Sequence, residues 1–200
     1  MNLLRFTPAF QDEVWPALGQ AARDRLERYW SDLLRYNRAQ NLISRRDPEG
    51  QLASMMEECL RAGRVLTARG LGGGRWADVG SGAGIPGLVL AAADPDQNLV
   101  LIERRQGRCD FLRREVAALE LDRVQVLESD VRELVLEPFD VVLAKAVANP
   151  CEIEALCRDV VGGILVVFGR ASDQVAAGWS LAWSEPLPGQ DSVLRALAPC

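Results

Sequence analysis

A glycine-rich segment near the middle of the chain has the residues best suited to hold a ligand. Residues 78–87 read DVGSGAGIPG and overlap a short apolar run at 76–79 that predicts a strand. Glycine there permits positive φ and lets a ligand lie against the backbone, and the helix expected beyond it offers amides at its N-terminus. A tight strand-to-helix turn without a ligand would have the same composition, so the segment alone leaves both interpretations open.

Two carboxylates lie where they could recognise a ligand on this turn. Asp78 precedes the first glycine by two residues, and Glu103 ends the next apolar run, about twenty residues beyond the turn. An acid at that place in a βαβ unit accepts hydrogen bonds from ribose hydroxyls. The segment is neither the GxGxxG of dinucleotide folds nor a P-loop. The spacing predicts a site for a ribose-containing ligand, with a solvated strand-end acid as the alternative.

The composition limits the available chemistry. The 200 residues contain no histidine, which excludes a histidine general base, a Ser–His–Asp triad and histidine-ligated metals. Five cysteines without a CxxC pair argue against a disulfide framework and a zinc site, and favour a reducing, cytoplasmic location. No apolar run reaches the ~18 residues of a membrane span, and no signal peptide is recognisable. We therefore expect neither a metal nor a membrane partner.

Charge is spread unevenly along the chain. The net charge is −5, yet residues 1–70 contain 11 Arg against nine acidic residues. An acidic chain has no overall nucleic-acid footprint, so any RNA contact would use a local patch, which the N-terminal third could supply. Among the 23 basic residues, Lys145 is the only lysine.

Hydrophobic periodicity divides the chain at about residue 70. Apolar residues at three- and four-residue spacing predict helices over 21–39 and 48–68, and a glycine-rich stretch follows at 70–74. Beyond it, apolar runs alternate with amphipathic segments, which predicts βαβ units and a mostly parallel sheet. We expect an N-terminal helical extension (1–70) and an α/β domain (71–200) that ends in a hairpin turning at 186–190. The predicted strands of this domain are 76–79, 99–103, 124–127, 139–143, 163–168, 181–184 and 192–198. Its predicted helices are 106–119 and 151–160.

The glycine-rich segment resembles the first motif of class I S-adenosylmethionine-dependent methyltransferases, whose fold also ends in a hairpin. The resemblance implies a Rossmann-like, mostly parallel seven-stranded sheet with an antiparallel last strand, preceded here by the N-terminal helices. It implies S-adenosylmethionine as the cofactor. Backbone amides around Asp130 are expected to contact adenine, with a plain loop acid as the alternative. The implied cofactor-binding residues are Asp78, Gly80, Ser81, Gly82, Ala83, Gly84, Pro86, Gly87, Glu103, Arg104, Asp130, Val131 and Arg132.

A narrower resemblance covers most of the chain. Three segments are similar, in the same order, to motifs of the glucose-inhibited division protein B family, also called 16S rRNA methyltransferase G; they are YNRAQNLI (36–43), DVGSGAGIPG (78–87) and FDVVLAKAVA (139–148). The pair Pro86-Gly87 is distinctive of this family. The resemblance implies methyl transfer to N7 of a guanine in 16S ribosomal RNA, either naked or in an assembling small subunit. We expect the protein to act as a monomer.

Several positions depart from the family pattern. A usual His and Asp of the N-terminal helix correspond to Met55 and Glu58, and a usual Lys corresponds to Gly107. Two usual arginines correspond to Asp130 and Lys145. Lysine keeps the charge of arginine but loses its bidentate fork. These departures concern the binding of substrate more than the binding of cofactor.

Methylation of guanine N7 requires no histidine. N7 already bears an in-plane lone pair and the sulfonium is an activated donor, so alignment, worth up to ~7–11 kcal/mol, is the main task. Lys145 is the expected catalytic residue and would hold a phosphate or guanine O6, with a strand-end surface charge as the alternative. Arg108 and two asparagines complete the expected substrate site. Asn37 and Asn41, four residues apart on one helical face, either line the base pocket or brace the helix end.

Three functions remain open. An rRNA guanine-N7 methyltransferase is favoured. A methyltransferase for a small molecule or a protein fits the acidic charge of residues 71–200, whereas the basic residues between 35 and 46 count against it. A degenerate member that binds cofactor without catalysis would explain the exchanges at Met55, Gly107 and Asp130.

Overall fold

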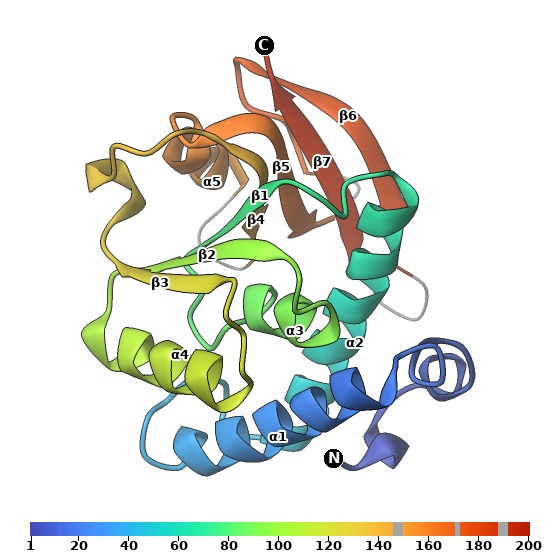
Figure 1. Cartoon of the computed structure of the whole chain (residues 1–200). Coiled ribbons are helices and arrows are strands. Elements are labelled where there is room, and N and C mark those ends of the chain that lie inside the picture. Colours follow the sequence, from blue (N-terminus) through green and yellow to red (C-terminus); the bar gives the residue numbers. More distant parts are fainter. Residues whose placement is uncertain (146–149, 171–172, 188–191) are drawn as a thin grey trace.

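A seven-stranded sheet forms the centre of the molecule (Figure 1). The computed structural model describes residues 1–145, 150–170, 173–187 and 192–200. The strands are β1 (Arg75–Val79), β2 (Asn98–Glu103), β3 (Val124–Glu128), β4 (Phe139–Ala144), β5 (Val161–Gly169), β6 (Trp179–Pro186) and β7 (Val193–Pro199). Their spatial order is β3-β2-β1-β4-β5-β7-β6. Strands β1 to β5 pair in parallel, and β7 is antiparallel to both β5 and β6.

This sheet confirms the predicted mostly parallel architecture with an antiparallel last strand. Each predicted strand is present, with bounds that differ from the expected ones by a few residues. Residues 146–148 of the segment FDVVLAKAVA and most of the turn expected at 186–190 lie outside the described residues.

The helices lie in two layers. Helices α1 (Gln20–Asn37), α2 (Pro48–Ala68), α3 (Gly87–Ala93) and α4 (Gln106–Ala118) pack on one face of the sheet, and α5 (Pro150–Cys157) packs on the other (Figure 1). Short helical turns span Leu3–Arg5, Phe10–Val14 and Val131–Glu133. Within the described residues, no helix is both long enough and apolar enough to cross a membrane.

The N-terminal helices begin and end where local chemistry dictates. Asp47 caps α2 by accepting the Gly50 N–H, and Pro48 occupies the first turn, where its missing N–H costs nothing. Helix α1 ends at Asn37 because the Asn37 Oδ1 accepts the N–H groups of Leu42 and Ile43, both at 2.9 Å. The chain therefore turns away before residue 41.

One continuous hydrophobic core joins the two sides of the predicted boundary. It contains Tyr29 and Leu52 from the N-terminal helices together with Leu101 and Phe111 from the α/β region. The boundary at residue 70 stays a prediction. The two regions are nevertheless buried against each other along α1, α2 and α3.

Glu115 of α4 is an unusual member of the interface with α1. Its side chain is fully buried, and neither carboxyl oxygen has a hydrogen-bond partner among the described residues. Burial raises the pKa of Glu115 to about 7; the Asp32 carboxylate also raises it, while Arg28, Arg35 and Arg114 oppose the shift. The folded protein therefore holds a proton on Glu115 that the unfolded chain releases at lower pH.

This proton makes stability depend on pH. Because the pKa is higher in the folded state, the contribution is fully present below the unfolded value near 4.5 and is lost as pH rises through about 7. We expect Glu115→Gln to raise the free energy of unfolding by about 1–3 kcal/mol at pH 8 and to give no gain at pH 4.5. Urea unfolding at both pH values measures this, with Glu120→Gln as an exposed control. A gain of equal size at both pH values would contradict the assignment.

Candidate functional site

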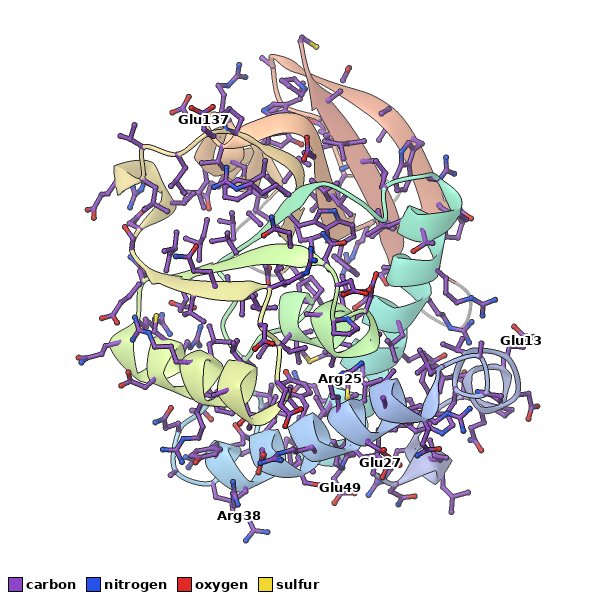
Figure 2. The ribbon with its side chains drawn as sticks, viewed as in Figure 1. Glu13, Arg25, Glu27, Arg38, Glu49 and Glu137 are labelled. Atoms are coloured by element: carbon purple, nitrogen blue, oxygen red, sulfur yellow. The ribbon has the colours of Figure 1, made fainter. Side chains whose placement is uncertain are left out.

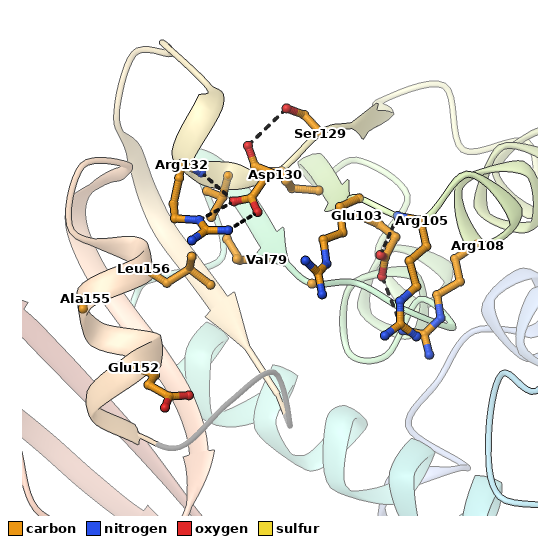
Figure 3. A pocket seen from close by; sticks show the side chains of 14 residues that line it. Val79, Glu103, Arg105, Arg108, Ser129, Asp130, Arg132, Glu152, Ala155 and Leu156 are labelled. Carbon is orange, nitrogen blue, oxygen red and sulfur yellow. Dashed lines mark hydrogen bonds and ion pairs between the residues drawn. The ribbon is translucent and has the colours of Figure 1, made fainter.

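A pocket of about 770 Å³ opens at the carboxyl ends of β1, β2 and β3, facing α5 (Figure 3). Ligands of open α/β sheets bind at this edge, next to the point where the strand order reverses. Here the reversal falls between β1 and β4. The pocket is lined by Val79, Gly80, Ile102, Glu103, Arg104, Arg105, Arg108, Ser129, Asp130, Val131, Arg132, Glu152, Ala155 and Leu156.

The glycine-rich turn borders this pocket through Gly80 and is held by hydrogen bonds from two sides. The N–H groups of Gly80 and Ser81 donate to the Ile102 carbonyl at 2.8 and 3.1 Å. Gly82 has φ +59°, a conformation that side-chain-bearing residues rarely adopt. From the other side, the Tyr29 hydroxyl of α1 donates to the Ala83 carbonyl at 2.8 Å. The turn is thereby clamped between β2 and the N-terminal helices.

Asp78 holds the turn by accepting two hydrogen bonds from it. Its Oδ2 accepts the Gly87 N–H at 3.0 Å, and the Ser81 hydroxyl donates to its carbonyl. A side chain at Gly87 would begin 2.6 Å from that same Oδ2, so only glycine permits this approach. Burial raises the pKa of Asp78 to about 7, while the hydrogen bond from Gly87 opposes the shift. The Asp78 carboxyl does not line the pocket.

The expected cofactor residues therefore divide into two groups. One group lines the pocket, namely Gly80, Glu103, Arg104, Asp130, Val131 and Arg132. The other group builds the buried turn without lining the pocket, namely Asp78, Ser81, Gly82, Ala83, Gly84, Pro86 and Gly87.

Glu103 is the buried acid of the pocket wall, with 5% of its surface exposed. Its Oε2 accepts the Gly82 N–H at 3.1 Å, and its Oε1 accepts the Arg105 N–H at 2.9 Å. The Arg108 guanidinium lies 3.5 Å from Oε2 and 3.5 Å from the point where a Gly82 side chain would begin. The carboxylate thus joins the turn to the start of α4 and faces the pocket, as Figure 3 shows.

Asp130 and Arg132 form the opposite wall. Asp130 accepts hydrogen bonds from the Arg132 backbone N–H at 3.1 Å and from its Nε at 2.9 Å. These bonds hold the pKa of the Asp130 carboxyl well below its usual range. The Asp130 carboxylate is therefore paired with Arg132, and both residues line the pocket.

Lys145 lies beside the turn but outside the pocket lining. Val79 pairs with Ala144, so Lys145 follows β4 at the level where Gly80 follows β1. Its ammonium donates to Glu58 of α2 and lies 4.9 Å from the centroid of the Phe168 ring. Sequence reasoning noted Glu58 only as a departure from a pattern, because 87 residues separate it from Lys145.

The two asparagines do not share a helical face, and that expectation is wrong. Helix α1 ends at Asn37, whose side-chain oxygen braces the following backbone, and Asn41 lies exposed beyond the turn. Neither residue lines the pocket. Of the two roles considered, the structure shows the bracing role for Asn37.

Sequence reasoning missed part of the pocket. The missed residues are Val79, Ile102, Arg105, Ser129, Glu152, Ala155 and Leu156. Ser129 directly follows β3 and could have been inferred from its place at the strand end. The sequence around the α5 residues gives no sign that they line a pocket. They reach this edge only because the chain crosses from β4 to β5 through α5. Among the described residues, no group of three or more Cys, Asp or Glu side chains could hold a metal ion.

The chain matches known proteins in sequence. The family model described as GidB, rRNA small subunit methyltransferase G, matches residues 22–175. A relative named ribosomal RNA small subunit methyltransferase G from Halorhodospira halophila is 43% identical over 131 residues, covering 66% of this chain and 60% of the relative. One of the same name from Bordetella avium is 30% identical over 181 residues, covering 86% of this chain and 80% of the relative.

Solved structures share the fold. A mutant of MtNAS has a TM-score of 0.62 at 18% identity, covering 90% of this chain and 74% of that one; its complex with S-adenosylmethionine has a TM-score of 0.59 at 17% identity, with coverage of 90% and 76%. The putative methyltransferase yhhF from Escherichia coli has a TM-score of 0.52 at 18% identity, covering 68% of this chain and 82% of that one. At such identities the likeness concerns the fold alone.

The evidence for family membership lies in sequence and covers most of the chain. The family model spans well over half of the 200 residues, from α1 to beyond β5, and includes the glycine-rich turn and the Glu103 strand end. Aligned relatives are 30% to 43% identical. The chain therefore belongs to the family of the rRNA small subunit methyltransferase G.

Proposed function

We propose that this protein is an S-adenosylmethionine-dependent methyltransferase that methylates N7 of a guanine in small-subunit ribosomal RNA. The observation that carries the proposal is the Glu103 carboxylate, buried in the pocket wall beside the clamped glycine-rich turn. Family membership supports ribosomal RNA as the substrate. The choice of N7 rests on the resemblance of the sequence motifs.

The residues of the pocket fit an adenosyl cofactor. A volume of about 770 Å³ falls within the usual range for small-molecule sites. Glu103 supplies acceptor oxygens for ribose hydroxyls, and Val131 with Leu156 offers apolar surface for a base. Gly80 lets the methionine portion approach the backbone at the carboxyl end of β1.

The chemistry that follows needs alignment rather than proton transfer. S-adenosylmethionine supplies an activated methyl group on a sulfonium. Guanine N7 carries a free lone pair, so the chain has no proton to remove and mainly holds the base in line with the methyl group. In this proposal Lys145, which follows β4 at the level of Gly80, donates a hydrogen bond to guanine O6 or to a phosphate.

A local basic surface next to the pocket supports a nucleic-acid substrate. Arg38, Arg45 and Arg46 follow α1, and Arg38 projects away from the body of the protein (Figure 2). Arg104 and Arg105 follow β2 at the pocket mouth. All five are exposed, and none has a carboxylate within 4.0 Å among the described residues.

The two basic segments adjoin each other. The Gln40 side chain lies 3.9 Å from the point where a side chain at Gly107 would begin, and Tyr36 contacts Phe111 of α4 at 5.5 Å between ring centroids. These five arginines, which we call the basic strip, would attract a phosphate backbone, although the whole chain is acidic. This strip favours RNA over the small-molecule or protein alternative.

The cofactor assignment predicts the effect of one isosteric change. Glu103→Gln removes the charge that accepts the ribose hydroxyls, so affinity for S-adenosylhomocysteine falls about 10- to 100-fold, as measured by titration calorimetry. Glu128→Gln is the control, because Glu128 ends the neighbouring strand in register with Glu103 but does not line the pocket. Equal affinities for the wild type and Glu103→Gln would refute this assignment.

The substrate assignment predicts a missing modification. Small-subunit RNA from cells that lack the gene should contain one N7-methylguanosine fewer than wild-type RNA, as measured by mass spectrometry of nucleosides. The purified protein with S-adenosylmethionine should restore it, on naked RNA or on isolated small subunits. An unchanged modification pattern would reject the RNA substrate, and absence of cofactor binding would leave neither methyltransferase hypothesis tenable.

The basic strip predicts a salt-dependent contribution to RNA affinity. The double variant Arg38→Ala, Arg46→Ala should weaken binding and make the slope of log affinity against log salt shallower by about 1.5, because two phosphate contacts are lost. Its affinity for S-adenosylhomocysteine should be unchanged. Arg123→Ala, an exposed arginine at the opposite edge of the sheet, is the control. Identical slopes for the two variants would contradict the strip as the RNA surface.

A further inference from the structure

Glu58 and Lys145 form an ion pair beside the glycine-rich turn. Their side chains are 8% and 14% exposed, and the pair joins α2 to the carboxyl end of β4. The Phe168 ring on β5 lies 4.9 Å from the ammonium and covers it from another side. Both charges are thus largely removed from water, so each depends on the other for compensation.

At both positions the sequence departs from the family motif it resembles but keeps the sign of the charge. Glu58 corresponds to a usual Asp, and Lys145 corresponds to a usual Arg. Glutamate is one carbon longer than aspartate, and the lysine side chain is shorter than that of arginine. The structure brings these exchanged side chains into direct contact. The departures at positions 58 and 145 therefore concern two side chains in contact with each other rather than two separate sites.

The position of the pair is next to the reacting centre of the proposed function. Lys145 and Gly80 are the residues that follow the paired strand ends Ala144 and Val79. A positively charged sulfonium and, after transfer, a positively charged methylguanine would both lie close to this point. An uncompensated ammonium there would raise the energy of both states.

We propose that Glu58 is a positioning residue for methyl transfer, which holds the Lys145 ammonium toward the target base and cancels its charge. This inference rests on the proposed function and names the partner through which Lys145 acts. Lys145 can then donate a hydrogen bond to guanine O6 without placing a net positive charge against the sulfonium.

The transfer balances without any further reactant. The lone pair of N7 forms the new N–CH₃ bond, the S–CH₃ bond breaks, and its electron pair stays on sulfur. The positive charge moves from sulfur to the guanine ring, and no proton leaves. Because the total charge at the centre is conserved, the neutrality of the Glu58–Lys145 pair serves both the substrate and the product state.

The neighbouring residue on α2 offers a matched control. Glu57 is also buried and also paired: it accepts hydrogen bonds from the Thr7 hydroxyl at 2.6 Å and from the Arg61 Nε at 3.0 Å. Its partners lie on the N-terminal segment and on α2 itself. Glu57→Gln therefore breaks a buried pair of the same kind on the same helix without touching Lys145.

The first experiment compares the two glutamines. We expect kcat of Glu58→Gln on small-subunit RNA to fall about 10- to 100-fold, by analogy with the loss found when a residue that orients a metal ligand is replaced. Its affinity for S-adenosylhomocysteine should stay within about twofold of the wild type, a change of at most ~0.4 kcal/mol. Glu57→Gln should keep kcat, measured at a temperature where both variants are folded.

The second experiment is a double-mutant cycle that tests the pairing itself. Glu58→Asp and Lys145→Arg should each lower kcat, because each alone alters the reach of the pair. The double variant, in which the shorter acid faces the longer cation, should recover kcat to within about threefold of the wild type. Effects that multiply would show that Glu58 and Lys145 contribute to kcat independently of each other.

The outcomes separate this inference from the proposed function. If the wild type binds S-adenosylhomocysteine but transfers no methyl group to ribosomal RNA, the proposed function fails and the inference with it. If the wild type transfers methyl groups and Glu58→Gln keeps kcat, or the effects in the cycle multiply, only the inference is overturned.

Discussion

The site depends on two buried carboxylates that bind backbone amides of the glycine-rich turn. Asp78 at the end of β1 accepts the Gly87 N–H, and Glu103 at the end of β2 accepts the Gly82 N–H. Hydrogen bonds to carboxylates are strong where water is excluded. They hold glycine in a conformation that few residues adopt, and every other element of the pocket is placed relative to this turn.

The N-terminal helices take part in building this site rather than merely preceding it. Helix α1 donates the Tyr29 hydroxyl to the turn and the Arg25 Nε to the carbonyl of Ala92, near the end of α3. Helix α2 contributes Glu58 to the ion pair with Lys145. The turn is thus held by the sheet on one side and by α1 on the other, with a hydrophobic core that crosses between them.

The distribution of charge matters more than its total. The chain has a net charge of −5, but Arg104 and Arg105 are exposed at the pocket mouth, and Arg38, Arg45 and Arg46 are exposed after α1. Deeper groups are compensated: Glu103 by amides and Arg108, and Lys145 by Glu58. Exposed cations can attract a phosphate backbone although the whole chain is acidic.

The sequence alone determined the elements, the sheet class and the edge of the sheet where the pocket lies, because periodicity, glycine spacing and the acid at the next strand end are local features. It also located Gly80, Glu103 and the residues near Asp130. Both Asn37 and Asp78 bind nearby backbone: Asn37 has the bracing role that was one of the two considered, and the Asp78 carboxyl does not line the pocket. Only the tertiary structure decided that Glu58 meets Lys145, because a contact across 87 residues depends on how α2 packs against the end of β4, which no local pattern encodes.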